Sequence, residues 1–143
     1  MIVKSLLRNY NAFIIGVGVK ADAEAFNKVV YGINNDRIID LIGKTNFDQL
    51  NAVFKKCDLL INPDNGMGHF AAAAGCPTVT LFSNALPEKY KPLHPLTEVV
   101  SSNCECMGQC DKYKRQKCGY KCLDNLKVDD VLYKIERLVH NIR

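Results

Sequence analysis

The sequence predicts an α/β fold: a Rossmann-like parallel sheet with helices on both faces. Short apolar runs typical of buried strands alternate with segments of helical periodicity. Glycine or polar residues follow several of these runs, as expected where a strand turns into a helix. A chain of 143 residues that is 48% hydrophobic suits one globular domain. We therefore predict a single domain over residues 1–143, with a cysteine-rich loop at 101–123.

The first half begins with apolar residues at helical spacing between residues 2 and 10. The run at 12–18 reads as a strand that ends in glycines, and the run at 37–43 as a second strand. A helix between them, from about residue 21, is predicted to bury Phe26, Val29 and Val30. Asn46 is a favoured N-cap residue, and it precedes a helix with an apolar face made of Phe47, Leu50, Val53 and Phe54.

The second half continues the alternation. Strands are predicted at 58–62, 78–82 and 98–100, with a proline-rich loop at 84–95. A helix from 67 to 74 is closed by Gly75 and Pro77. The last helix begins near residue 128. Parallel sheets of this kind bind ligands at the carboxyl ends of their strands, so the turns after the strands are the places to search for a site.

The composition of the chain limits its cellular location and the kinds of ligand that it can be expected to bind. No apolar run approaches the roughly 20 residues of a membrane span, and the N-terminal segment has no signal-peptide pattern, so we expect a cytoplasmic protein. A net charge of +4 suits phosphorylated ligands or peripheral contact with an anionic membrane face. It does not indicate nucleic-acid binding.

The stretch "LLINPDNGMGHFAAAAGCP" places a polar, glycine-rich turn between a strand and an alanine helix. The free N–H groups and the dipole of such a helix favour an anion at its start. Asp64 or Asn65 can cap the helix, and His69 in its first turn can donate a hydrogen bond to a phosphate oxygen. We interpret this turn as a phosphate-binding corner. The alternative is a plain turn with a helix cap and a surface histidine.

Two earlier strand ends have a similar character. In "GKTNF", Thr45 offers a hydroxyl just before the Asn46 cap, although the spacing of a P-loop is absent. In "GVGVKADAE", a G-x-G turn is followed by Glu24 in the first turn of a helix. Because the carboxyl ends of parallel strands share one edge, we expect all three turns to face one rim.

Together, "DLIGKTNFDQLNAVFKKCDLLINPDNGMGHFAAAAGCPTVTLF", "PEKYKPLHP" and the late "CL-x-x-L-x-x-D-x-V" pattern resemble the heptosyltransferase family of lipopolysaccharide biosynthesis, glycosyltransferase family nine. Such enzymes have two Rossmann-like domains in the GT-B arrangement. The resemblance implies that this chain is the C-terminal domain, which binds an ADP-sugar donor. The N-terminal domain of the family binds the glycan or lipid-linked acceptor and supplies a catalytic base.

The resemblance also implies roles for individual residues. Asp64 would lie near the donor sugar or diphosphate, and His69 would contact a phosphate. Thr45 falls where the family contacts the nucleoside, and Glu24 where an acid meets the ribose. The backbone amides that would line the diphosphate belong to Asn65, Gly66 and Met67. We assign no catalytic residue within this chain.

The chain departs from the family pattern in what it lacks. The N-terminal domain is missing, and so is the first strand of the donor domain, which is central in the usual strand order. The strands at 12–18 and 58–62 would then flank a slot with unpaired backbone groups. We expect an incomplete glycosyltransferase domain, or one that takes a strand from a partner or a second copy. The alternative is a non-catalytic or degenerate nucleotide-binding domain.

The cysteine-rich loop contains five of the seven cysteines, in the pattern C-x-C-x₃-C-x₇-C-x₃-C. Thiolates could bind a structural zinc or iron ion there, with Cys106, Cys110, Cys118 and Cys122 as the ligands. We favour reduced thiols or a local disulfide, and we expect no cofactor. Lysines and tyrosines in the loop allow a nucleic-acid-binding knuckle as a rival, but the positive charge is local and the aromatic residues are few.

Overall fold

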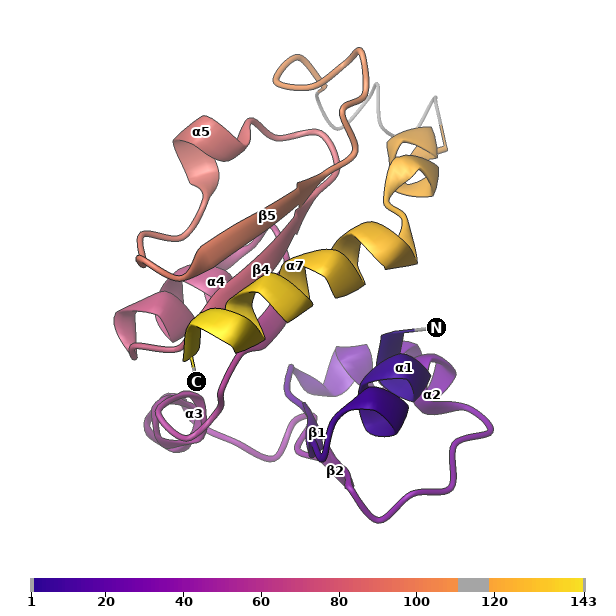
Figure 1. Ribbon diagram of the computed structural model, residues 1–143, viewed down its shortest axis with the longest axis vertical. Coiled ribbons are helices and arrows are strands. Elements are labelled where there is room, and N and C mark those ends of the chain that lie inside the picture. Colours follow the sequence, from indigo (N-terminus) through magenta and orange to yellow (C-terminus); the bar gives the residue numbers. More distant parts are fainter. Residues whose placement is uncertain (1, 111–118, 143) are drawn as a thin grey trace. The chain divides into compact units, whose positions relative to one another are not determined.

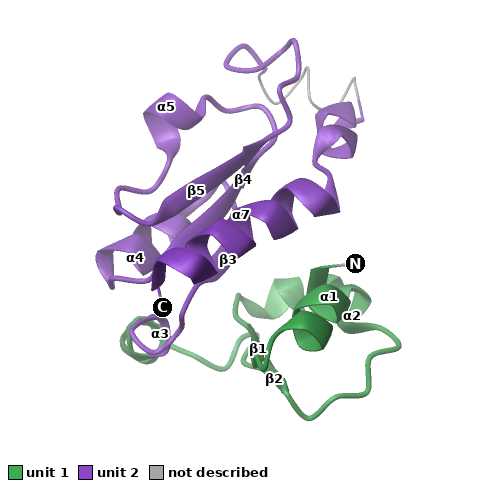
Figure 2. Ribbon diagram, in the orientation of Figure 1, with its two compact units in different colours: residues 1–52 green, residues 53–143 purple. Residues whose placement is uncertain are grey.

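The computed structural model describes residues 2–110 and 119–142 (Figure 1). The chain divides into two compact units, residues 1–52 and residues 53–143 (Figure 2). Each unit is described by itself.

Unit 1 contains a two-stranded parallel sheet. Its elements are α1 (Ile2–Asn9), β1 (Ile14–Gly16), a 3-10 turn (Lys20–Asp22), α2 (Ala23–Val30), β2 (Ile38–Asp40) and the start of α3 (Phe47–Phe54). Ile14 pairs with Ile38, and the pairing continues to the end of both strands. The turns that follow the two strands are joined, because the Gly43 N–H donates to the Gly18 carbonyl at 2.8 Å.

Helix α1 is fixed by an apolar stripe and by a cation at its end. Val3, Leu6 and Leu7 are each 8% exposed. The Arg37 guanidinium, just before β2, donates to the carbonyl oxygens of Leu7 at 2.7 Å and Tyr10 at 3.2 Å. Carbonyl groups at a helix C-terminus lack partners within the helix and favour positive charge, so Arg37 ties α1 to the sheet.

Two predictions about apolar faces in unit 1 are wrong. Val29 of α2 is 47% exposed, and Phe47 at the first position of α3 is 76% exposed. Phe26 of α2 lies directly over Gly16 of β1. Two strands of three residues provide little area for a helix to cover, so the apolar residues of α2 do not all find a partner within this unit.

Unit 2 contains a three-stranded parallel sheet in the order β3–β4–β5. Leu60 pairs with Thr78, and Thr78 pairs with Thr97. The complete elements of unit 2 are β3 (Leu60–Pro63), α4 (Gly66–Ala73), β4 (Thr78–Phe82), α5 (Pro87–Tyr90), β5 (Thr97–Ser101), a 3-10 turn (Lys121–Asn125) and α7 (Val128–Ile142). The short helix α5 lies inside the segment that the sequence predicted to be loop.

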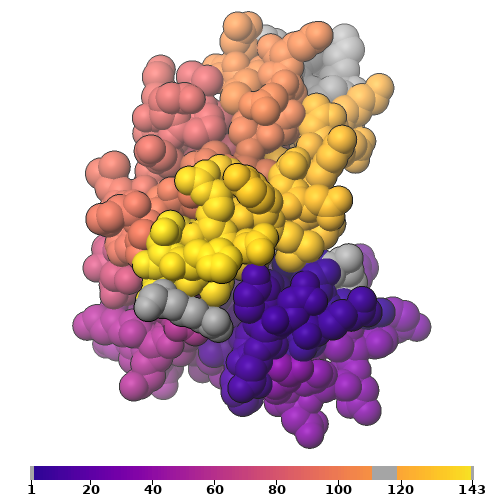
Figure 3. All heavy atoms as spheres, in the orientation of Figure 1, coloured from indigo at the N-terminus to yellow at the C-terminus, as the bar shows by residue number. Residues whose placement is uncertain are grey.

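Helix α7 covers part of the unit 2 sheet. It passes in front of β4 in Figure 1, and its outer side forms the yellow surface in Figure 3. Its inner residues Val131, Ile135 and Leu138 are at most 2% exposed. Glu98 of β5 adds an ion pair with Lys134 at 2.8 Å. The alanine side chains of α4 occupy little space. Ala71 is fully buried, and this helix approaches β3 and β4 closely.

Parallel strands alternating with helices confirm the predicted α/β fold class. Within the described residues β1 has β2 as its partner strand and β3 has β4, so the two sheets are separate.

Candidate functional site

The predicted phosphate-binding corner lies where β3 ends and α4 begins. The Asp64 N–H donates to the Leu81 carbonyl at 3.0 Å, which continues the β3–β4 pairing just beyond β3. Asn65 is extended (φ −159°, ψ 175°), and its Oδ1 accepts the Met67 N–H at 3.0 Å. Asn65 is therefore the N-cap of α4, and the first amides of the helix lie at the carboxyl edge of the sheet.

The first turn of α4 is open to an approaching ligand. A Cβ added at Gly66 would meet no other heavy atom within 4 Å. The free N–H groups of a helix N-terminus carry partial positive charge, which favours an anion. The space beside Gly66 allows such an anion to reach the backbone.

Asp64 and His69 lie at this same corner and interact electrostatically. Burial raises the pKa of the Asp64 carboxyl above its usual value, and the nearby His69 opposes part of that rise. The arrangement combines an acid, an imidazole and the N–H groups of Asn65 and Gly66 within six residues of chain.

A buried polar pair beneath the corner was not foreseen from the sequence. Asn62 of β3 is 4% exposed; its Oδ1 accepts the Thr80 hydroxyl at 3.2 Å, and its Nδ2 donates to the Pro63 carbonyl at 2.6 Å. A Cβ at Gly68 would lie 2.6 Å from Asn62 Nδ2. Asn62 therefore sets how closely the first turn of α4 approaches β3. An asparagine within an otherwise apolar strand was the available signal.

Thr45 and Glu24 belong to unit 1. Thr45 is half-buried and precedes the cap of α3, where Asn46 and Gln49 exchange side-chain to backbone hydrogen bonds of 2.9 and 3.0 Å. Glu24 is exposed and pairs with Lys28 at 2.7 Å. A site shared by these residues and the Asp64 corner stays a prediction.

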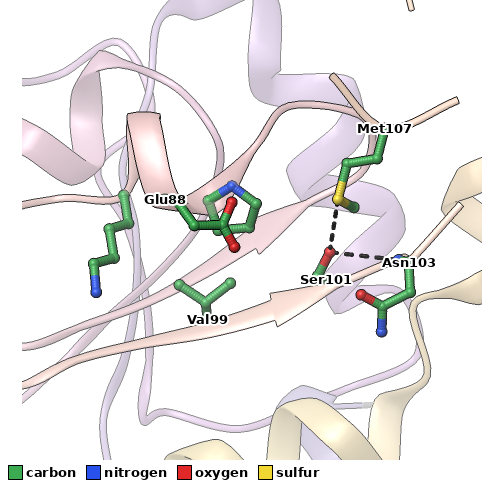
Figure 4. Close-up of a pocket in the computed structure, with 7 residues that line it drawn as sticks. Glu88, Val99, Ser101, Asn103 and Met107 are labelled. Atoms are coloured by element: carbon green, nitrogen blue, oxygen red, sulfur yellow. Dashed lines mark hydrogen bonds between the residues drawn. The ribbon is translucent and has the colours of Figure 1, made fainter. Parts of the chain in front are cut away.

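A separate cavity of about 310 Å³ lies over β5 (Figure 4). It was not foreseen from the sequence. The Ser101 hydroxyl donates to the Met107 sulfur at 3.6 Å and accepts the Asn103 N–H at 3.4 Å. The residues that line the cavity are Pro87, Glu88, Lys91, Val99, Ser101, Asn103 and Met107.

The cysteines fall into two environments. Cys76 is 1% exposed, and burial raises its pKa to about 12, as expected of a buried, unreactive thiol. In the cysteine-rich loop, Cys104 and Cys106 have their sulfurs 3.4 Å apart. The Cys104 side chain raises the pKa of Cys106 to about 12. Burial raises the pKa of Cys104, but hydrogen bonds from Ser102 and from Cys106 outweigh burial, so its net shift is downward.

The predicted metal site is only partly within the described residues, because Cys118 lies outside them. Among residues 2–110 and 119–142, no group of three or more histidine, cysteine or acidic side chains is arranged to hold a metal ion. The zinc or iron site stays a prediction. Over the same residues, no helix is both long enough and apolar enough to cross a membrane.

Comparison with known proteins gives consistent matches. The profile of glycosyltransferase family 9 (heptosyltransferase) matches residues 4–120. A lipopolysaccharide core heptosyltransferase, OpsX, from Haemophilus influenzae is 31% identical over 93 residues, which is 65% of this chain and 26% of that protein. Lipopolysaccharide heptosyltransferase 3 from Escherichia coli is 26% identical over 140 residues, which is 96% of this chain and 40% of that protein.

Solved structures show the same fold. The structure of E. coli ADP-heptose lps heptosyltransferase II superposes with a TM-score of 0.79 at 22% identity, over 98% of this chain and 40% of that one. A glycosyl transferase of family 9 from Veillonella parvula also gives a TM-score of 0.79, at 26% identity, over 96% of this chain and 39% of that one. This chain spans between about a quarter and two fifths of the length of these proteins.

Proposed function

Because this chain belongs to glycosyltransferase family 9, we propose that it forms the donor-binding part of a heptosyltransferase-like enzyme and binds a nucleotide-sugar. The observation that carries this proposal is the Asp64–His69 corner. The N–H groups of Asn65 and Gly66, an open glycine and an imidazole meet there at the carboxyl edge of a parallel sheet. A diphosphate is the part of a nucleotide-sugar that suits such a place.

The proposed roles follow from charge. The amides of Asn65 and Gly66 bind the diphosphate oxygens, and His69 donates a hydrogen bond to a phosphate. The Met67 amide, which donates to Asn65 Oδ1 at 3.0 Å, would share its hydrogen with a diphosphate oxygen. The Asp64 carboxylate would repel a phosphate, so it serves a sugar hydroxyl or orients His69, with which it interacts. In unit 1, Thr45 would contact the nucleoside and Glu24 the ribose.

The reaction we propose is transfer of the sugar from the diphosphate to an acceptor hydroxyl, with inversion at the anomeric carbon. As the bond to the diphosphate breaks, negative charge develops on the leaving oxygen. Amides at the start of α4, together with His69, would stabilise that charge. We place none of this chain's residues as the base that activates the acceptor hydroxyl.

The identity of donor and acceptor is proposed from the relatives. One superposed structure is described as an ADP-heptose enzyme, and the related sequences are named for lipopolysaccharide. We therefore propose an ADP-sugar as donor, a glycan or lipid-linked acceptor, the GT-B arrangement for the whole enzyme, and action on the cytoplasmic side of the membrane.

Thermal unfolding of the chain with ADP, UDP or GDP tests the donor assignment. Ligand at about 100 times its Kd stabilises a protein by roughly 2.7 kcal/mol, so ADP should raise the unfolding temperature clearly. His69→Gln should remove most of this ADP-dependent shift. His140→Gln is the matched control, because His140 is exposed near the end of α7, and it should leave the shift intact. A cooperative transition that no nucleoside diphosphate moves would sink the proposal.

A further inference from the structure

We propose that Cys104 and Cys106 form a thiol–disulfide exchange site, which reacts with small-molecule disulfides such as glutathione disulfide to give a reversible bridge between the two residues. The site is separate from the proposed donor corner and does not depend on it. The proposal stands on the position of the two sulfurs and on the contacts that hold their loop.

The two sulfurs are already in contact. Cys104 Sγ lies 3.4 Å from Cys106 Sγ, and both side chains are half-buried, so a small reagent can reach them. In contrast, the buried Cys76 thiol donates to the carbonyl groups of Cys57 and Pro77. A disulfide requires side chains that point toward each other across a short gap, and this pair meets that condition.

The loop that carries the pair is held on both sides. Before the pair, the Asn103 N–H donates to the Ser101 hydroxyl at 3.4 Å; after it, the Met107 sulfur accepts from the same hydroxyl at 3.6 Å (Figure 4). The Met107 N–H also donates to the Cys104 carbonyl at 3.0 Å, which closes a turn around the two cysteines.

A second set of contacts ties the loop to the end of β4. The Cys104 thiol donates to the Ser83 carbonyl at 3.2 Å, and the Gly108 N–H donates to the Asn84 carbonyl at 2.7 Å. Because these contacts restrict the loop, the second thiol attacks as an intramolecular reagent at high effective concentration.

The exchange proceeds in two balanced steps. The Cys104 sulfur attacks one sulfur of the small disulfide; the small S–S bond breaks, one thiolate leaves, and the Cys104 proton passes to solvent. Once Cys104 is in the mixed disulfide, the Cys106 thiol gives its proton to solvent, attacks the Cys104 sulfur and expels the second small thiolate, and both expelled thiolates take up protons. Two protein thiols are oxidised and one small disulfide is reduced to two thiols.

Mass spectrometry of the whole chain tests the site. Reduced protein is treated with glutathione disulfide, remaining thiols are alkylated, and the chain is cut by a protease that cleaves after glutamate. Cleavage after Glu105 separates the two cysteines. The expected product is therefore a joined pair of peptides, residues 99–105 and 106–136, which a reductant separates. Because the second peptide contains four cysteines, fragmentation of the joined pair must assign the bridge to Cys104 and Cys106.

Variants make the result specific. Cys106→Ser should stop at a mixed disulfide with glutathione on Cys104, whereas Cys110→Ser, which removes the next cysteine of the same loop, should still form the bridge. The proposal is overturned if glutathione accumulates on the unaltered chain without a bridge, if the bridge involves another cysteine, or if Cys110→Ser abolishes it. It is also overturned if Cys104 and Cys106 are alkylated as completely after treatment as before it.

Discussion

Replacing Asn65 with aspartate separates the two roles that we assign to the start of α4. Asn65 caps the helix through Oδ1, which accepts the Met67 N–H at 3.0 Å. An aspartate oxygen occupies the same position, so the cap is kept. A negative charge at a helix N-terminus also adds about 0.3–1 kcal/mol of stability. We therefore expect Asn65→Asp to fold at least as stably as the unaltered chain.

The same change should weaken nucleotide binding. If a diphosphate binds the first amides of α4, the new carboxylate faces it at a separation of about 5 Å. Coulomb's law at an effective dielectric constant between about 20 and 80 then gives a repulsion of about 1–3 kcal/mol. Each 1.4 kcal/mol is about tenfold in affinity, so ADP should bind roughly 5- to 150-fold more weakly.

Two further variants complete the comparison. Asn65→Ala removes the cap and should cost about 1 kcal/mol of stability. Gly75→Ala acts at the other end of α4. Gly75 has φ +85°, and an added Cβ would meet no heavy atom within 4 Å, so only backbone strain of about 1–2 kcal/mol is expected. Gly75→Ala is the matched control, since it should weaken the fold and leave ADP affinity unchanged.

The assays are urea unfolding for stability and calorimetric titration with ADP for affinity. The reasoning is refuted if Asn65→Asp binds ADP as tightly as the unaltered chain, because the diphosphate then lies elsewhere. It is equally refuted if Gly75→Ala, measured under conditions where it is fully folded, loses affinity as strongly as Asn65→Asp.

Three other outcomes follow from the structure. Gly68→Ala should destabilise the chain by about 1–3 kcal/mol in urea unfolding, because its Cβ would lie 2.6 Å from Asn62 Nδ2; an unchanged midpoint would contradict the close approach. Glu98→Gln should cost about 1–2 kcal/mol, because the 15% exposed Glu98 carboxylate pairs with Lys134 at 2.8 Å and with Arg137 at 3.4 Å and the variant lacks both ion pairs; the cost should shrink at high salt. Burial raises the pKa of Asp64 in the folded chain, so the folded state binds that proton more tightly than the unfolded state. The free energy of unfolding should therefore fall as pH rises through the raised pKa. Asp64→Asn should remove this fall and be more stable than the unaltered chain at neutral pH, with no difference at low pH, as urea midpoints at both would show.

Elements with strong local signals could be predicted from the amino-acid sequence. The run at 78–82 forms β4 with those same bounds, and the last helix begins at Val128 as predicted. Asn65 caps α4, and Asn46 with Gln49 caps α3. The two caps depend on hydrogen bonds between residues two or three apart, and the bounds of β4 and α7 follow from local apolar patterns, so a short stretch of sequence specifies all of them. The glycine-rich corner after β3 was predicted for the same reason.

Contacts between distant segments determine which helix faces are covered and which polar groups are buried. Val29 and Phe47 have the helical spacing of core residues and yet are exposed, since burial requires a partner surface that periodicity does not report. Asn62 can be buried because Thr80, 18 residues further along on β4, donates a hydrogen bond to its side chain. Likewise, the loop that carries Cys104 and Cys106 is hydrogen-bonded to the carbonyl groups of Ser83 and Asn84, just after β4. Local hydrogen bonds can be inferred from neighbouring residues, whereas burial and side-chain contact depend on segments that only the folded chain brings together.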